Sequence, residues 1–165
     1  MTAKLFGGKT LKIAGVVCIG LIVIGLAIAI HAYMTVVYPV DRAIGYLNQA
    51  QTAGSPSTMA NYMEQARDII EERQGNPCWI LPTESTNWDI IKANLDECIQ
   101  YARNMASPDF NGDLQQGMDD IRGKLRVFCE QMNNAALWSY ASPINILLAI
   151  MWCFFILVSA AYWID

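Results

Sequence analysis

A long apolar segment near the N-terminus constrains this chain more than any other feature. Residues 13–33 read IAGVVCIGLIVIGLAIAIHAY and are apolar except for His31. An α-helix rises about 1.5 Å per residue, so a helix of this length is sufficient to cross the roughly 30 Å hydrocarbon core of a bilayer. A second apolar segment, residues 144–164, lies at the other end of the sequence. Together they predict two transmembrane helices.

The segment between the two apolar stretches, residues 41–142, is polar and acidic. It holds 14 acidic and 8 basic residues, which gives it a formal charge of −6. A segment of this length is enough for one compact domain with its own core, so we expect a single domain here. An acidic surface repels the nucleic-acid backbone, and we therefore expect no nucleic-acid partner.

The charges near the N-terminus predict the orientation in the membrane. Lys4, Lys9 and Lys12 precede the first apolar segment, with no acidic residue among them. Basic residues at the end of a span favour the cytoplasmic side, so we expect both termini in the cytoplasm. The apolar segment is longer than the core of a secretory signal, which has about 7–15 residues, and it predicts a retained signal anchor.

This orientation divides the chain into four parts. We expect a cytoplasmic segment, a first transmembrane helix, an extracytoplasmic helical domain and a second transmembrane helix, over residues 1–12, 13–38, 39–142 and 143–165. Aromatic residues are typical of membrane interfaces. They occur at Tyr33, Tyr38, Trp138 and Tyr140 on the expected outer side, and at Tyr162 and Trp163 on the inner side. The predicted location is the cell membrane, which the chain crosses twice.

Small residues share one face of each apolar segment. Because small residues let membrane helices approach closely, they predict helix-packing positions. They are Ala14, Cys18, Gly25 and Ala29 in the first segment, and Ala149, Cys153 and Ala160 in the second. The obvious packing partner is the other span of the same chain, and a helix of another membrane protein is the alternative.

Apolar spacing in the first half of the polar segment predicts two helices. Proline disfavours the helical conformation in the residue before it, so we expect a kink or short break at Pro39. A helix then follows over residues 40–51, with inward positions at Val40, Ile44 and Leu47. The next helix is expected to start at a capping Ser57 or Thr58 and to bury Met59, Met63, Ala66 and Ile70.

The second half contains two regular heptad patterns, which predict an antiparallel helix pair. The apolar positions of the third helix, capped at Ser85 or Thr86, are Trp88, Ile91, Leu95, Cys98, Ala102 and Met105. Those of the fourth are Leu114, Met118, Ile121, Leu125, Phe128, Met132 and Ala135. Ser142 and Pro143 then predict the start of the second span. The predicted fold is all-α: two transmembrane helices flanking an extracytoplasmic antiparallel bundle of about four helices.

One long loop, residues 75–87, joins the second predicted helix to the third. Its residues Trp79, Ile80 and Leu81 are apolar and lie between two prolines. Because they belong to no amphipathic helix, they are the best candidate for a partner contact. Two alternatives stay open for them: they could plug the end of the bundle, or they could dip into the lipid headgroups.

The extracytoplasmic location predicts a disulfide between Cys78 and Cys129. Antiparallel pairing of the heptads places Cys129 level with the start of the third helix, near the loop that holds Cys78. Cys98 lies about seven residues further along that helix, or roughly 10 Å away. A disulfide requires Cα atoms about 4.4–6.8 Å apart, so Cys98 is the poorer partner. The alternative is three unpaired thiols, as in a reducing compartment.

No motif in the sequence indicates catalysis. The one histidine, His31, lies in the first apolar segment, so the polar segment contains no histidine-based triad or zinc site. His31 itself is a candidate intramembrane polar site, although a side chain that reaches the nearby interface is the commoner case. Methionines at helical spacing are interpreted as core filler rather than copper ligands. We expect no enzymatic activity, no metal and no cofactor.

These features favour a non-catalytic accessory or assembly subunit of a larger integral membrane protein complex. Its expected partners are other integral membrane subunits and the lipid bilayer. The layout is similar, in architecture alone, to bacterial chemoreceptors, whose ectodomain also lies between two spans. That resemblance implies a ligand-sensing ectodomain that signals through a partner, since no cytoplasmic output domain is expected after Asp165. The other alternative is a cofactor-bearing membrane subunit that uses His31.

Overall fold

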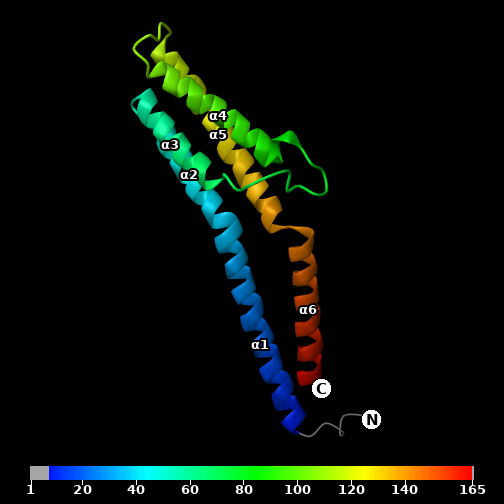
Figure 1. Ribbon diagram of the computed structural model, residues 1–165. Helices are drawn as coiled ribbons and strands as arrows, with labels where there is room; N and C mark the ends of the chain where they lie inside the picture. The colour runs from blue at the N-terminus through cyan, green and yellow to red at the C-terminus, as the bar shows by residue number, and fades with distance from the viewer. Residues whose placement is uncertain (1–7, 165) are drawn as a thin grey trace. The chain divides into compact units, whose positions relative to one another are not determined.

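The computed structural model describes residues 8–164, and it describes the side chains of residues 15–161. Helices make up most of this range and no strand occurs in it (Figure 1), so the predicted all-α class is confirmed. The chain forms two compact units, one of Met1–Tyr33 with Ala141–Asp165 and the other of Met34–Tyr140. The side chains of Ala14, Tyr162, Trp163 and the three N-terminal lysines lie outside the described part.

The first unit contains the two most apolar helices, α1 (Gly8–Ala32) and α6 (Pro143–Ile164), which pack against each other. Both are long and apolar enough to cross a membrane, and no residue of their apolar stretches is buried. A helix that is apolar on all sides normally lies in a protein core or in lipid. Because the described chain does not bury them, α1 and α6 are candidate membrane spans.

The predicted break at Pro39 is absent. A π-helical turn (η1, Tyr33–Val37) leads directly into α2 (Tyr38–Gln51), and Pro39 lies in the first turn of α2. A proline ring in a regular α-helix clashes with the carbonyl group four residues earlier, which here belongs to Thr35. A π turn contains one extra residue and widens the helix at this point, so the chain stays helical through the proline.

The second unit is a bundle of α2, α3 (Pro56–Ile69), α4 (Trp88–Met105) and α5 (Leu114–Tyr140) (Figure 1). Each helix packs against its neighbours in the chain, and α5 closes the ring by packing against α2. Short connections favour antiparallel packing of α2 with α3 and of α4 with α5, whereas a long loop joins α3 to α4. The prediction of about four helices is therefore confirmed.

Most of the bundle core consists of residues that the apolar spacing predicts; the exception in α2 is Ile44, which is half-buried, while Ala43 and Ala50 are buried in addition to Val40 and Leu47. All six heptad positions of α4 are buried, and so are six of the seven in α5. The exception is Leu114, which lies in the first turn of α5 and is 47% exposed. Five of the buried core residues are methionines, at Met59, Met63, Met105, Met118 and Met132. The interpretation of these methionines as core filler is confirmed.

Two helices of the bundle begin at residues other than the predicted caps. The Ser55 side chain accepts a hydrogen bond from the amide of Thr58 and caps α3, because Pro56 occupies the first helical position. The Asn87 side chain caps α4 by accepting from the amide of Asp89. The predicted caps of α3 and α4, at Ser57 or Thr58 and at Ser85 or Thr86, are wrong. The cap of α6 is as predicted, since Ser142 Oγ accepts from the Asn145 amide.

Arg122 sets the register of α5 against α2. Its Nε donates to the Gln51 carbonyl at 2.9 Å and its Nη2 donates to the Ala53 carbonyl at 3.1 Å. These carbonyls belong to the end of α2 and the turn that follows, where helix carbonyls have no partner inside the helix. A partly buried arginine therefore caps α2 and fixes its position along α5.

Candidate interaction surface

The loop between α3 and α4 exposes three apolar side chains. Trp79, Ile80 and Leu81 are 46%, 55% and 74% exposed, and we call these three residues the apolar tip. Ile80 and Leu81 therefore do not fill the end of the bundle, and the plug alternative is wrong for them, whereas Trp79 also contacts Trp138. Three adjacent exposed apolar residues are unusual unless something covers them.

Asn76 organises the base of the loop beneath the tip. Its Nδ2 donates to the Thr83 carbonyl at 2.6 Å. Its Oδ1 accepts from the Cys78 amide at 3.0 Å and from the buried Thr86 hydroxyl at 2.9 Å. The Cys78 thiol is buried and donates to the Leu81 carbonyl at 3.1 Å. One amide side chain therefore holds both arms of the loop, and the tip projects from an ordered base.

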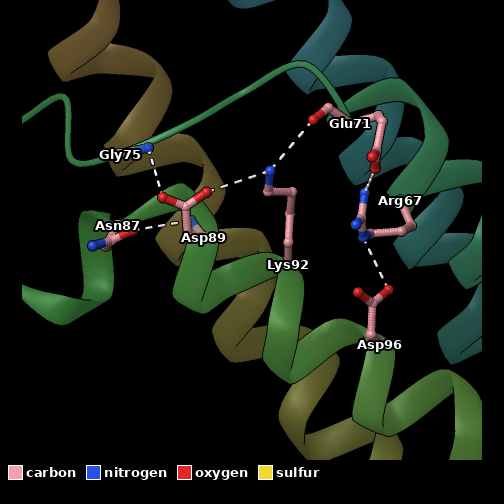
Figure 2. Close-up of polar contacts among 7 residues, drawn as sticks. All are labelled: Arg67, Glu71, Gly75, Asn87, Asp89, Lys92 and Asp96. Carbon is pink, nitrogen blue, oxygen red and sulfur yellow. Dashed lines mark hydrogen bonds and ion pairs between the residues drawn. The ribbon is translucent and has the colours of Figure 1, made fainter.

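A second set of contacts ties the start of the loop to α4. Gly75 has a φ of +64°, a left-handed conformation that glycine adopts without steric cost. Its amide donates to Asp89 Oδ2 at 2.9 Å, and its carbonyl accepts from the Trp88 amide, also at 2.9 Å. Figure 2 shows Gly75 above the first turn of α4, beside Asn87 and Asp89. The loop therefore cannot move without disturbing this turn.

Charged residues extend this anchor to α3. Arg67 of α3 forms an ion pair with Glu71, just after the end of that helix, and a second one with Asp96 of α4 at 2.9 Å. Lys92 pairs with Asp89 at 3.4 Å and donates to the Glu71 carbonyl at 3.3 Å (Figure 2). Exposed ion pairs contribute little stability individually. Their effect here is positional, because they connect the end of α3 to the first turns of α4.

Two contacts place the loop at a defined end of the bundle. The Trp79 and Trp138 rings meet edge to face, with centroids 6.5 Å apart. Trp138 lies in the last turn of α5, a few residues before the start of α6 in the sequence. At the other side, Arg73 Nη2 donates to the carbonyls of Thr35 and Val36, at 2.9 and 3.1 Å. The loop therefore lies at the end of the bundle where the chain continues into α1 and α6.

Arg73 is half-buried at this end of the bundle. Burial lowers the pKa of its guanidinium, while the nearby Glu72 raises it in opposition. An arginine starts from so high a pKa that it stays charged at neutral pH. An open cleft of about 640 Å³ lies beside it, with Asp68 and Glu72 among the residues that line it. The arginine thus carries a full positive charge close to the backbone of η1.

The predicted Cys78–Cys129 disulfide is not formed, and all five cysteines are free thiols. The Cys129 sulfur lies 3.8 Å from Asn48 Oδ1 and 3.9 Å from Gln51 Nε2, so it faces α2. The loop packs instead against Trp138, which is nine residues further along α5, or roughly 13 Å away. The prediction failed because it used only the pairing of the third and fourth predicted helices. In the structure the Cys129 side chain faces α2, and the sequence did not show how α2 packs against α5.

Burial affects the ionisation of two thiols in the bundle, Cys98 and Cys129. Burial is the main cause that raises the pKa of the Cys98 thiol, with Glu97 adding to the rise and Lys124 opposing it. Burial likewise raises the pKa of the Cys129 thiol. A raised pKa lowers the thiolate fraction at neutral pH, and the thiolate is the reactive form. Both residues are therefore poor nucleophiles.

The contact between α1 and α6 centres on Gly25 and Trp152. The indole ring lies so close to Gly25 that a Cβ atom there would overlap it. Trp152 Nε1 donates to the Leu21 carbonyl at 2.7 Å. In a low-dielectric environment an indole N–H requires such an acceptor. The sequence signal for this contact was a tryptophan within one apolar segment and a glycine within the other. That the two residues face each other is shown by the structure.

The predicted small-residue positions divide into two sets. Cys18, Gly25 and Ala160 are partly buried, whereas Ala29, Ala149 and Cys153 are exposed. The α6 side of the contact therefore uses Trp152 rather than the small residues at Ala149 and Cys153. His31 lies exposed in the last turn of α1. Within residues 8–164, no group of three or more His, Cys, Asp or Glu side chains is arranged to hold a metal ion.

The loop base makes a prediction about the reactivity of Cys78. Replacing Asn76 with alanine removes three hydrogen bonds and leaves the Cys78 amide without its acceptor, whereas the Thr86 hydroxyl keeps the Thr83 carbonyl. An unsatisfied buried group costs about 1–3 kcal/mol, so we expect the loop to open and Cys78 to alkylate about tenfold faster. Mass spectrometry of each cysteine peptide measures the rate, and the exposed Asn104→Ala serves as control. Equal Cys78 rates in the two variants would show that Asn76 does not order the loop.

No family model matches the chain, and no curated protein or solved structure is similar to it. The class of protein is therefore defined by its own architecture. The described chain is an all-helical protein that has two candidate membrane spans, four helices in a bundle, and an apolar tip on an ordered loop.

Proposed function

We propose that this protein is a non-catalytic accessory or assembly subunit of a larger integral membrane protein complex. The observation that carries this proposal is the apolar tip. Trp79, Ile80 and Leu81 expose apolar surface on a loop whose base is internally hydrogen-bonded. Aromatic and large apolar side chains are the usual anchors of protein interfaces.

Two kinds of partner could cover the apolar tip: lipid or protein. Insertion into lipid requires apolar area but no particular backbone conformation. Docking on a protein gains affinity when the contact residues are already ordered, because less conformational entropy is lost on binding. The Asn76 contacts and the Gly75 anchor order this loop in the absence of a partner. A protein surface is therefore the occupant we propose.

The proposed location is the cell membrane, with both termini in the cytoplasm and residues 41–142 outside. The support for this orientation is the three lysines that precede the first apolar segment in the sequence, since basic residues favour the cytoplasmic side of a span. In this arrangement we expect the apolar tip near the outer membrane surface, because Trp138, which Trp79 contacts, lies close in sequence to α6. Val36, which accepts a bond from Arg73 of the same loop, lies close in sequence to α1. The proposed partners are thus other integral membrane subunits.

A comparison of two leucine variants tests the subunit proposal. Leu81 in the tip and Leu114 at the start of α5 are both exposed leucines of the bundle unit. We expect the native protein, extracted in mild detergent, to comigrate with larger membrane proteins on a native gel. Leu81→Ser should weaken this association at least about tenfold, as loss of a buried anchor does, while Leu114→Ser should leave it unchanged.

The outcomes distinguish the proposal from its alternatives. If the native protein runs as a monomer or homodimer and Leu81→Ser changes nothing, the subunit proposal fails. A ligand-sensing ectodomain would then be the better hypothesis, and ligand-induced changes in melting temperature would test it. A third outcome is that Leu81→Ser leaves the association unchanged. If it reduces only the quenching of tryptophan fluorescence by doxyl-labelled phospholipid in nanodiscs, the tip contacts lipid and the protein-docking proposal is wrong.

A further inference from the structure

Charged side chains bridge two of the grooves between neighbouring helices of the bundle. Between α3 and α4, Arg67 pairs with Asp96 at 2.9 Å (Figure 2), and Arg103 pairs with Glu64 at 2.6 Å. Between α5 and the end of α2, Arg122 donates to two backbone carbonyls. The charges at these two grooves therefore find their partners within the chain.

The groove between α4 and α5 holds opposite charges that are not paired. An open cleft of about 330 Å³ lies there, and we call it the α4/α5 groove; its lining includes Asn94, Glu97, Lys124 and Val127. Glu97 and Lys124 are exposed, and neither forms an ion pair within the part of the chain that the structure describes. The groove therefore presents one negative and one positive group to a partner.

Glu97 and Lys124 lie at similar heights along the bundle. Each directly precedes a buried core residue, which is Cys98 in α4 and Leu125 in α5. Burial is the main cause of the raised pKa of the Cys98 thiol, and Lys124 and Glu97 act on that pKa in opposite directions. Because the effect of a charge falls with distance, both side chains must lie near this thiol.

Exposed apolar side chains lie beside the two charges. Val127 lines the cleft and is 51% exposed. Tyr101, one turn after Glu97, is 42% exposed, and its hydroxyl lies 3.1 Å from where a Cβ atom at Gly117 of α5 would be. The tyrosine ring therefore lies along the same groove. Apolar burial provides affinity in an interface, while charges fix its orientation and exclude wrong arrangements.

We propose that the α4/α5 groove is an interface with a second copy of this chain. A two-fold interface joins the same patch on both copies, so that patch must be complementary to itself. A two-fold axis parallel to α4 and α5 keeps residues of equal height opposite each other. Glu97 of each copy then meets Lys124 of the other. A different partner would not require both charges on one patch at similar height.

The pairing of copies is independent of the proposed function, because it uses residues of α4 and α5 rather than the apolar tip. A homodimer on the native gel that Leu81→Ser leaves unchanged would contradict the subunit proposal while agreeing with this interface. Failure of the pairing would in turn leave the comparison of the leucine variants standing.

The test exchanges the two charges between copies. Full chains that carry a donor or an acceptor fluorophore are reconstituted in phosphatidylcholine liposomes, and energy transfer at decreasing protein-to-lipid ratios gives the dissociation constant. Glu97→Lys gives each copy two positive groups and Lys124→Glu gives it two negative groups. We expect either variant alone to associate at least about tenfold more weakly than the native chain, because like charges then meet. A mixture of the two variants regains both pairs and should associate nearly as tightly as the native chain.

Mixing separates pairing between copies from pairing within one copy, because a pair within one copy cannot be restored by another chain. Glu130→Lys is the matched control, since Glu130 is exposed on α5 and lies outside the lining of the cleft. It should leave the dissociation constant unchanged, and circular dichroism checks that each variant keeps its helices. A mixture that associates no more tightly than either variant alone would overturn the interface, as would a native chain that shows no energy transfer.

Discussion

Replacing Gly25 with leucine is expected to break the contact between α1 and α6. The Trp152 ring occupies the space that any side chain at residue 25 would need, and α1 backbone lies directly beneath it. Overpacking of this kind costs about 1–3 kcal/mol, and displacement of the ring also removes the hydrogen bond to the Leu21 carbonyl. The helices must therefore separate or rotate.

Fluorine NMR of the protein labelled with 5-fluorotryptophan measures this change, with the Trp152 signal assigned from Trp152→Phe. We expect Gly25→Leu to move that signal and to lower the thermal midpoint in micelles. Gly20→Leu is the matched control on the same helix, because a Cβ atom at residue 20 meets no atom within 4 Å. If both leucine variants shift the Trp152 signal alike, the change reflects added bulk rather than loss of the contact.

Replacing Trp88 with alanine should destabilise the bundle more than any substitution on its surface. Trp88 is 2% exposed and is the largest of the fully buried side chains in the described core. Removing a buried aromatic ring costs about 3–5 kcal/mol, from lost burial and from the cavity left behind. For a domain of this size we expect the thermal midpoint to fall by about 12 °C or more.

Circular dichroism of the whole protein in micelles follows this transition. Ile90→Ala is the control, because Ile90 lies in the same turn of α4 but is 36% exposed. Its midpoint should change by no more than a few degrees. A similar drop in both variants would mean that α4 does not pack as described. The alanine keeps the backbone N–H that donates to the Gly75 carbonyl, so loss of the loop anchor would not explain the drop.

Much of the fold could be predicted because helical periodicity is a local property. The apolar segments of α1 and α6 and the heptads of α4 and α5 are regular along the sequence, and burial follows that regularity. The start of α6 was predicted for the same reason, since Ser142 and Pro143 act on the residues directly after them. For the interaction surface, the identity of the apolar tip was predictable, but its exposure was not.

The remaining features depend on contacts between residues distant in the sequence, and only the tertiary structure decided them. Thr86 did not cap α4 because its hydroxyl binds Asn76, and Cys129 did not meet Cys78 because Arg122 sets the register of α5. Pro39 did not break the helix, since η1 relieves its crowding and Arg73 supplies a donor. A sequence pattern defines which face of a helix is apolar, but partners for single polar groups are chosen by the packing of whole helices.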